Sequence, residues 1–178
     1  MIHPINLLLG DEIIGIELGV YQARTTVMLL QNCPSIKTLY GVDNWLPFDD
    51  KIKDSYNDEI EVSVSRPEAE LNFHVAHNHV KYSGFADKCI LLKEDTNKTA
   101  ERFEQSFFDF IFLDAHLNKE QFSNDLEIWY PKLKKGGLFA GHDWNCDVVR
   151  DLTYNFRTKY NINEKLSIGD NTFMWIKK

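Results

Sequence analysis

The sequence predicts an α/β protein with a mostly parallel sheet sandwiched by helices and with at least one antiparallel strand. Three observations support this fold class. Short apolar runs alternate with segments of helical periodicity, which is typical of βα units. The run FDFIFL at 108–113 is almost continuously apolar, as expected of a central strand buried on both faces. A Gly-Asp-Asn turn at 169–171 separates two short β-like runs and indicates a hairpin.

The first part of the chain predicts one strand–helix–strand unit. An apolar run over 13–17 is expected to be a strand that ends at Glu17. A helix is expected over 24–31 and a second strand over 36–42. Because one helix separates the two strands at this spacing, the strands are expected to be parallel and the crossover right-handed.

Residues 46–64 are rich in Asp, Lys and Ser and show no sustained period, so a loop or short helix covering one face of the sheet is expected. A helix then begins near Pro67 and ends at Gly84. Apolar residues at helical spacing mark its inward face: Ala69, Phe73, Ala76 and Val80. We expect a single domain over residues 1–178, in which 46–84 is an insert that forms a lid.

The second half of the chain repeats the alternation of strand and helix. Strands are expected at 88–93, 108–113 and 138–141, and helices at 97–105, 119–133 and 147–160. The sequence KKGG at 134–137 is expected to be a turn. The last two apolar runs, 165–168 and 172–176, are expected to form the hairpin.

Composition limits the class of function. The 178 residues carry a net charge of −7, so a broad footprint for nucleic acid is not expected. The cysteines lie far apart without a CxxC pair, which favours the reducing cytoplasm. No secretory signal is recognised, and no apolar run approaches the ~20 residues that span a bilayer. The oligomeric state stays open, and a homo-oligomer is compatible with the sequence.

Polar residues follow every predicted parallel strand. Because parallel strands end at one edge of a sheet, these residues are expected to converge on one ligand site. They are Glu17, Asp43, Asp95, Asp114 with His116, and His142 with Asp143. Capping of the following helices explains some of these acids, but it is a weak explanation for all the positions together.

This edge suits a cationic ligand with a ribose better than a dinucleotide. Only the first glycine of a GxGxxG pattern, Gly19, is present, and Tyr21 takes the second glycine place. A carboxylate-lined edge would also repel a pyrophosphate, which argues against a nucleotide-binding oxidoreductase. Asp43, at the end of the second strand, could accept hydrogen bonds from both ribose hydroxyls.

The motifs IELGVYQARTT, YGVDNW, LLKEDT, FDFIFLDAH and YPKLKKGGLFAGHDW, in this order, resemble those of the class I S-adenosylmethionine-dependent methyltransferases. The resemblance covers about residues 13–176 and is specific for the family rather than for a substrate. It implies a Rossmann-like three-layer sandwich with a sheet of seven strands in the order 3-2-1-4-5-7-6 and a C-terminal antiparallel hairpin. The main departure is Ala23, where the family has a glycine.

The resemblance also implies S-adenosyl-L-methionine as the cofactor. Glu17 and Gly19 match the motif beside its methionine part, and Asp43 matches the acid that holds the ribose. Asp95 and Thr96 match the position beside the adenine. The full expected cofactor-binding set is Glu17, Gly19, Val20, Tyr21, Asp43, Asn44, Trp45, Asp95, Thr96 and Asp114.

Methyl transfer is an in-line displacement at a sulfonium carbon, so the protein aligns the reactants and takes a proton when the acceptor is a hydroxyl. His142 and His116 are the candidate bases, and Asp114 lies near the cofactor amine and the acceptor. We therefore predict methylation of an oxygen atom on a small polar acceptor such as a sugar.

Three alternatives remain open. Asp114, His142 and Asp143 could hold a divalent metal such as Mg²⁺, although a His ligand weakens the case for that ion. A metal-dependent hydrolase would use these three residues and His116 as metal ligands. A relative that binds the cofactor without turnover is also compatible with the motifs.

Overall fold

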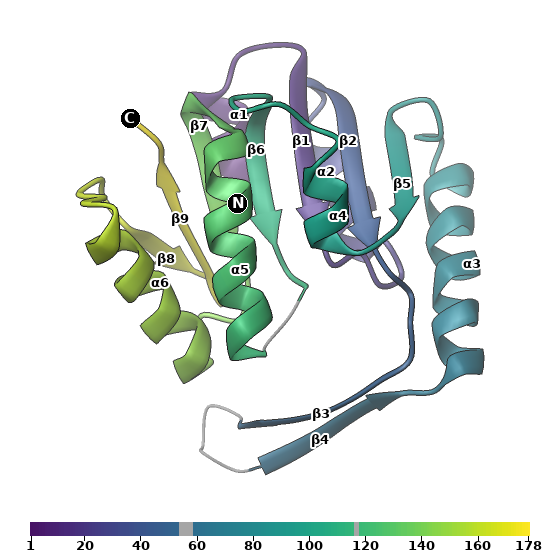
Figure 1. Cartoon of the computed structure of the whole chain (residues 1–178). Coiled ribbons are helices and arrows are strands. Elements are labelled where there is room, and N and C mark those ends of the chain that lie inside the picture. Colours follow the sequence, from purple (N-terminus) through teal and green to yellow (C-terminus); the bar gives the residue numbers. More distant parts are fainter. Residues whose placement is uncertain (54–58, 116–117) are drawn as a thin grey trace.

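The computed structural model describes residues 1–53, 59–115 and 118–178. Its main sheet has seven strands in the order β5-β2-β1-β6-β7-β9-β8 (Figure 1). Numbered along the chain within this sheet alone, the order is the expected 3-2-1-4-5-7-6. β9 runs antiparallel to both β7 and β8, whereas the other neighbouring strands of this sheet are parallel, which confirms the C-terminal hairpin. The strands are β1 Ile13–Leu18, β2 Ile36–Asp43, β5 Cys89–Lys93, β6 Phe108–Leu113, β7 Leu133–Gly141, β8 Ser167–Gly169 and β9 Thr172–Ile176.

Helices cover both faces of this sheet, so the expected three-layer sandwich is confirmed. On one face pack α1 Ile2–Leu8, α2 Arg24–Asn32 and α3 Arg66–Tyr82. On the other pack α4 Thr96–Ala100, α5 Lys119–Trp129 and α6 Asp147–Lys159, with the 3₁₀ turn η1 Tyr130–Lys132.

Strand β6 shows how the sequence builds the two cores. Successive side chains of a strand point to opposite faces of the sheet. Phe110 and Phe112 therefore join the α1–α3 core, whereas Ile111 and Leu113 join the α4–α6 core. All four are buried, which is why this segment reads as a continuous apolar run.

The prediction for residues 46–64 was wrong. Instead of a loop or short helix over the sheet, β3 Phe48–Lys53 and β4 Glu59–Val64 pair as a separate antiparallel ribbon. The ribbon projects beyond the end of the main sheet toward which the parallel strands point (Figure 1). The alternation of polar and apolar residues in EIEVSV at 59–64 is the period-two signal that identifies a strand.

The start of α3 agrees with the prediction. Pro67 lies in its first turn, and Ser65 forms a capping box with Glu68, in which each residue's side chain accepts a backbone N–H of the other. The helix ends at Tyr82, just before Gly84, whose φ of +81° ends the helical conformation.

Two further boundaries differ from the prediction. Strand β7 begins at Leu133, earlier than the predicted start at 138. Residues 134–137, which were predicted to be a turn, belong to the strand, and the N–H of Gly136 donates to the carbonyl of Lys177. Helix α4 ends at Ala100 rather than at the predicted 105. The residues that follow make hydrogen bonds between positions three apart, as in a 3₁₀-helix, such as Arg102 N–H to Thr99 O.

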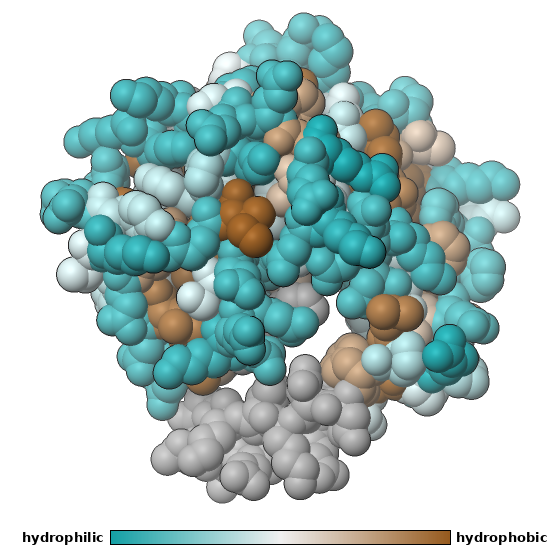
Figure 2. All heavy atoms as spheres, viewed as in Figure 1, coloured by the Kyte–Doolittle hydropathy of each residue, from teal (hydrophilic) through white to brown (hydrophobic). Residues whose placement is uncertain are grey.

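The described helices include none that is both long and apolar enough to cross a membrane. On the face shown in Figure 2, hydrophilic residues predominate and apolar residues form small separate groups.

Candidate active site

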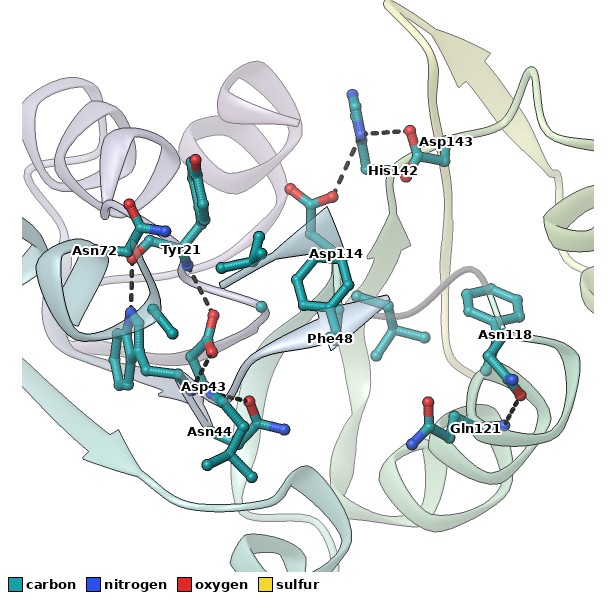
Figure 3. Close-up of a pocket in the computed structure, with 18 of the residues that line it drawn as sticks. Tyr21, Asp43, Asn44, Phe48, Asn72, Asp114, Asn118, Gln121, His142 and Asp143 are labelled. Carbon is teal, nitrogen blue, oxygen red and sulfur yellow. Dashed lines mark hydrogen bonds and ion pairs between the residues drawn. The ribbon is translucent and has the colours of Figure 1, made fainter. Parts of the chain in front are cut away.

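A cavity of about 770 Å³ opens where the parallel strands end (Figure 3). Its volume lies in the upper part of the range for small-molecule sites, about 300–1,000 Å³. It brings together eight of the residues predicted from the sequence: Gly19, Tyr21, Asp43, Asn44, Trp45, Asp114, His142 and Asp143. The convergence expected at this edge of the sheet is therefore present for these residues.

Gly19 lets the turn after β1 pass close to the end of β6. Its φ is +89°, and a Cβ atom there would lie 2.1 Å from the carbonyl oxygen of Asp114. Any other residue would clash with this backbone, so only glycine fits. At the start of α2, Ala23 also has a left-handed conformation, with φ +59°. This explains the glycine expected there, and the alanine costs roughly 1–2 kcal/mol.

Asp43 holds the turn between β1 and α2. Its Oδ2 accepts hydrogen bonds from the N–H groups of Val20 (3.1 Å) and Tyr21 (2.8 Å). Its Oδ1 accepts from the N–H of Trp45 (2.8 Å). A carboxylate has about four lone-pair sites. In this arrangement backbone N–H groups occupy three of these sites. That Asp43 also holds the ribose hydroxyls stays a prediction.

Glu17 lies below the cavity rather than on its wall. Its side chain is buried and shares a hydrogen bond with Thr26 of α2. Its pKa is raised to about 8, mainly by burial; the hydrogen bond from Thr26 opposes the rise, and the nearby acids Asp114 and Asp43 add to it. Val20 is also buried, and its backbone N–H donates to Asp43. Both residues support the turn from beneath.

The two residues expected beside the adenine have different positions. Asp95 caps α4 by accepting from the N–H groups of Asn97 (2.9 Å) and Lys98 (3.3 Å). Thr96 lines a small cleft that shares Gly19, Asp43 and Asn44 with the main cavity. Its hydroxyl donates to the buried carboxyl of Asp125 at 2.8 Å, and burial raises the pKa of Asp125 to about 7.

Trp45 joins the turn to α3. Its Nε1–H donates to the carbonyl of Tyr21 (2.7 Å), and its ring packs edge-on against Phe73 of α3, with centroids 4.9 Å apart. The ring is almost fully buried yet borders the cavity. That it flanks an adenine stays a prediction.

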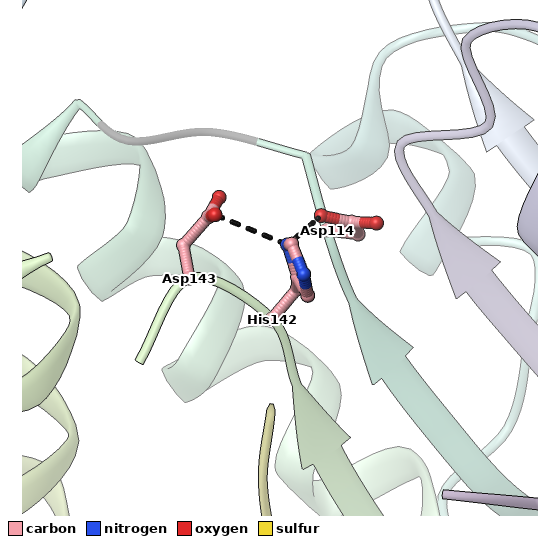
Figure 4. Close-up of side chains that lie close together, drawn as sticks. All are labelled: Asp114, His142 and Asp143. Carbon is pink, nitrogen blue, oxygen red and sulfur yellow. Dashed lines mark ion pairs between the residues drawn. The ribbon is translucent and has the colours of Figure 1, made fainter. Parts of the chain in front are cut away.

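At the other end of the cavity, His142 lies between two carboxylates (Figure 4). Its Nδ1 is 3.3 Å from Oδ1 of Asp114 and 3.0 Å from Oδ1 of Asp143. Hydrogen bonds to these two acids raise the pKa of His142 to about 10. Burial raises the pKa of Asp114, although the hydrogen bond from His142 opposes it. The cluster therefore holds a proton on the imidazole at neutral pH. His116, the other predicted base, lies outside the described residues.

Comparison with known proteins identifies the family. A family profile described as a methyltransferase domain matches residues 16–144, which is most of the chain. The chain belongs to this methyltransferase family. The resemblance that the sequence motifs suggested is thereby confirmed. A search of curated protein sequences returned no match.

Solved structures share the methyltransferase fold. A protein from Corynebacterium glutamicum superposes with a TM-score of 0.70 at 11% identity, over 99% of this chain and 77% of its own. The O-methyltransferase NovP superposes with a TM-score of 0.63 at 19% identity, over 99% of this chain and 79% of its own. The S-adenosylhomocysteine-bound methyltransferase PaMTH1 of Podospora anserina superposes with a TM-score of 0.66 at 13% identity, over 93% of this chain and 71% of its own. At these identities the likeness shows the fold alone.

The side chains of Asp114, His142 and Asp143 also lie close enough together to hold a metal ion. One ligand atom from each residue lies within 4.8 Å of the others. The set contains one nitrogen and two oxygen donors, whereas Mg²⁺ prefers oxygen alone and imidazole suits Zn²⁺ or Fe²⁺ better. A metal would also have to displace the proton that the imidazole now shares with both acids. Magnesium therefore stays a prediction.

Sequence reasoning missed several residues that line the cavity. They come from α5, the ribbon and α3, and include Asn118, Gln121, Asn124, Phe48, Val64 and Asn72. The three amides of α5 recur every third residue at the start of a helix, which is the only local signal that places them on neighbouring turns. The others carry no such signal, because the ribbon was not recognised.

Proposed function

We propose that this methyltransferase transfers the methyl group of S-adenosylmethionine to an oxygen atom of a small polar acceptor such as a sugar. The observation that carries the proposal is that Gly19, Asp43 and Asp114 line one cavity at the carboxyl edge of the parallel strands. The O-methyltransferase NovP and the S-adenosylhomocysteine-bound PaMTH1, which share the fold, support it.

The residues present fit this cofactor. When bound, S-adenosylmethionine supplies a positively charged sulfonium whose methyl carbon is electrophilic. Carboxylates at both ends of the cavity, Asp43 and Asp114, favour a cation electrostatically. The remaining lone pair of Asp43 can accept one ribose hydroxyl, and the glycine turn before Tyr21 lets a ligand approach the backbone. Glu17 contributes by fixing this turn from below.

The acceptor hydroxyl must lose its proton during transfer. His142 already shares its proton with two carboxylates, which suits a positioning role better than that of a free base. Asp114 receives this hydrogen bond on Oδ1, and no hydrogen bond to its Oδ2 occurs within the described ranges. We assign proton acceptance to Asp114 and its orientation to His142; a role for His116 stays a prediction.

Thermal unfolding with added ligands tests the cofactor. A ligand that binds only the folded state stabilises it by about 2.7 kcal/mol at a hundred times its Kd, which corresponds to a rise in Tm of roughly 5–10 °C for a chain of this size. We expect S-adenosylmethionine and S-adenosylhomocysteine to give such a rise and NAD to give none. If neither sulfur ligand shifts the Tm at millimolar concentration, the proposal is wrong.

Two variants test the catalytic assignment. Asp114→Asn should lower turnover by at least 100-fold, as expected for loss of a general base, while S-adenosylhomocysteine still binds. His142→Gln should also bind S-adenosylhomocysteine, and its turnover should fall by a smaller factor than that of Asp114→Asn. Wild-type turnover in Asp114→Asn would contradict the assignment. Adding EDTA and then Mg²⁺ or Mn²⁺ to the same assay tests for a metal: loss and recovery of turnover would assign Asp114, His142 and Asp143 as its ligands.

A further inference from the structure

The wall opposite the cofactor turn carries a row of amide side chains. Asn118, Gln121 and Asn124 come from successive turns at the start of α5 and line the cavity. In Figure 3, Asn118 and Gln121 lie across the cavity from Asp43 and Asn44. An amide offers both N–H donors and a carbonyl acceptor. A row of amides therefore matches hydroxyl groups, which donate and accept hydrogen bonds themselves.

These amides are available to a ligand. Oδ1 of Asn118 accepts from the N–H groups of Glu120 (3.0 Å) and Gln121 (3.4 Å), so this side chain is held in place by capping α5 while its NH₂ remains to donate. Within the described ranges no hydrogen bond engages the side chains of Gln121 or Asn124. The row thus combines one fixed donor with two adaptable groups.

The cavity is also negatively charged. Among the residues that the structure describes, its titratable lining residues are Tyr21, Asp43, Asp114, Glu120, His142 and Asp143. These residues include four carboxylates and a single imidazole, so negative charge predominates. Glu120 is exposed at the mouth beside the amide row. A phosphate or carboxylate on the acceptor would enter against this field, whereas a neutral or amine-bearing acceptor would not.

The base of the ribbon supplies an apolar surface on the same cavity. Phe48 and Val64 are register partners in β3 and β4, and both line the cavity. Phe48 remains 45% exposed. It offers an apolar face to the C–H groups of a ring-shaped ligand, beside amides that bind its hydroxyls.

We propose that the acceptor is an uncharged or amine-bearing polyol, such as a glycoside or amino sugar, rather than one that carries phosphate or carboxylate. This inference rests on the proposed function and adds the charge class of the acceptor and the residues that select it. Gln121 and Asn124 bind its hydroxyls, Phe48 packs against its ring, and Glu120 with the strand-end acids disfavours anions.

Ligand-observed NMR tests this with the full-length protein saturated with S-adenosylhomocysteine. The probes are four sugars of similar size: methyl glucoside, glucosamine, glucuronic acid and glucose 6-phosphate. We expect the first two to bind with a Kd at least ten-fold lower than the last two. Acidic probes that bind as tightly as the neutral ones would overturn the inference.

A charge-introducing variant makes the test specific to this wall. Gln121→Lys should lower the preference for neutral over acidic sugars at least ten-fold. Gln31→Lys, at the exposed end of α2, is the matched control and should leave the preference unchanged. If S-adenosylhomocysteine binds but none of the four sugars does, the inference fails and the cofactor assignment stands. If S-adenosylhomocysteine itself does not bind, both fail.

Discussion

Replacement of Asp43 by Asn should weaken both the fold and cofactor binding, because the carboxylate holds three backbone N–H groups. Asn keeps only one carbonyl oxygen, so the N–H of Trp45 or those of Val20 and Tyr21 lose their acceptor. Leaving one part-buried N–H unpaired costs about 1–3 kcal/mol, and weakening two charge-assisted bonds to neutral ones costs about 1 kcal/mol each.

The side chain is half-buried, so solvent replaces part of what is lost, and a net cost of about 2 kcal/mol is expected. For a chain of this size, that lowers the Tm by roughly 4–8 °C. The displaced turn should also lower the affinity for S-adenosylhomocysteine at least ten-fold. Differential scanning fluorimetry and isothermal titration calorimetry measure the two effects.

Asp95→Asn is the matched control. Asp95 is also an acid that follows a strand, and it caps α4 through two N–H groups. Because Asn is as good an N-cap as Asp, the Tm should change by less than about 2 °C. Equal behaviour of the two variants, or an unchanged Tm and affinity in Asp43→Asn, would refute the argument that Asp43 builds the cofactor turn.

Three further predictions concern the residues around this turn. Gly19→Ala should prevent folding or lower the Tm by more than 10 °C, because its Cβ would lie 2.1 Å from a backbone oxygen; Gly84→Ala, with a similar φ of +81° and open space, should cost only about 1 kcal/mol. Glu17 has a pKa raised from 4.5 to about 8, so the folded state keeps a proton that the unfolded state loses, and stability falls as pH rises through this window. The Tm of Glu17→Gln relative to wild type should therefore rise from pH 5 to pH 8, and a constant difference would contradict the raised pKa. Thr96→Val removes the hydrogen bond to the buried Asp125 and should cost about 1–3 kcal/mol, more at pH 8 than at pH 5, as denaturant unfolding at the two pH values can measure.

The sequence by itself determined the order of elements in the main sheet, through local periodicity, and the family, through motifs at strand ends. The strand order followed only as what the resemblance to that family implies. Because a parallel sheet places every strand end at one edge, the residues at those ends were expected to converge. The sequence therefore also determined that Gly19, Asp43, Asp114 and His142 share a cavity.

Only the tertiary structure decided what those side chains do. Asp43 turned out to accept from two backbone N–H groups of the glycine turn and from that of Trp45, Glu17 to be buried against Thr26, and His142 to lie between two acids. Nothing in a one-dimensional pattern specifies which way a carboxylate at a strand end turns, because its partners come from distant segments. The same holds for the amides of α5, which face the cavity only because α5 packs beside β6 and β7.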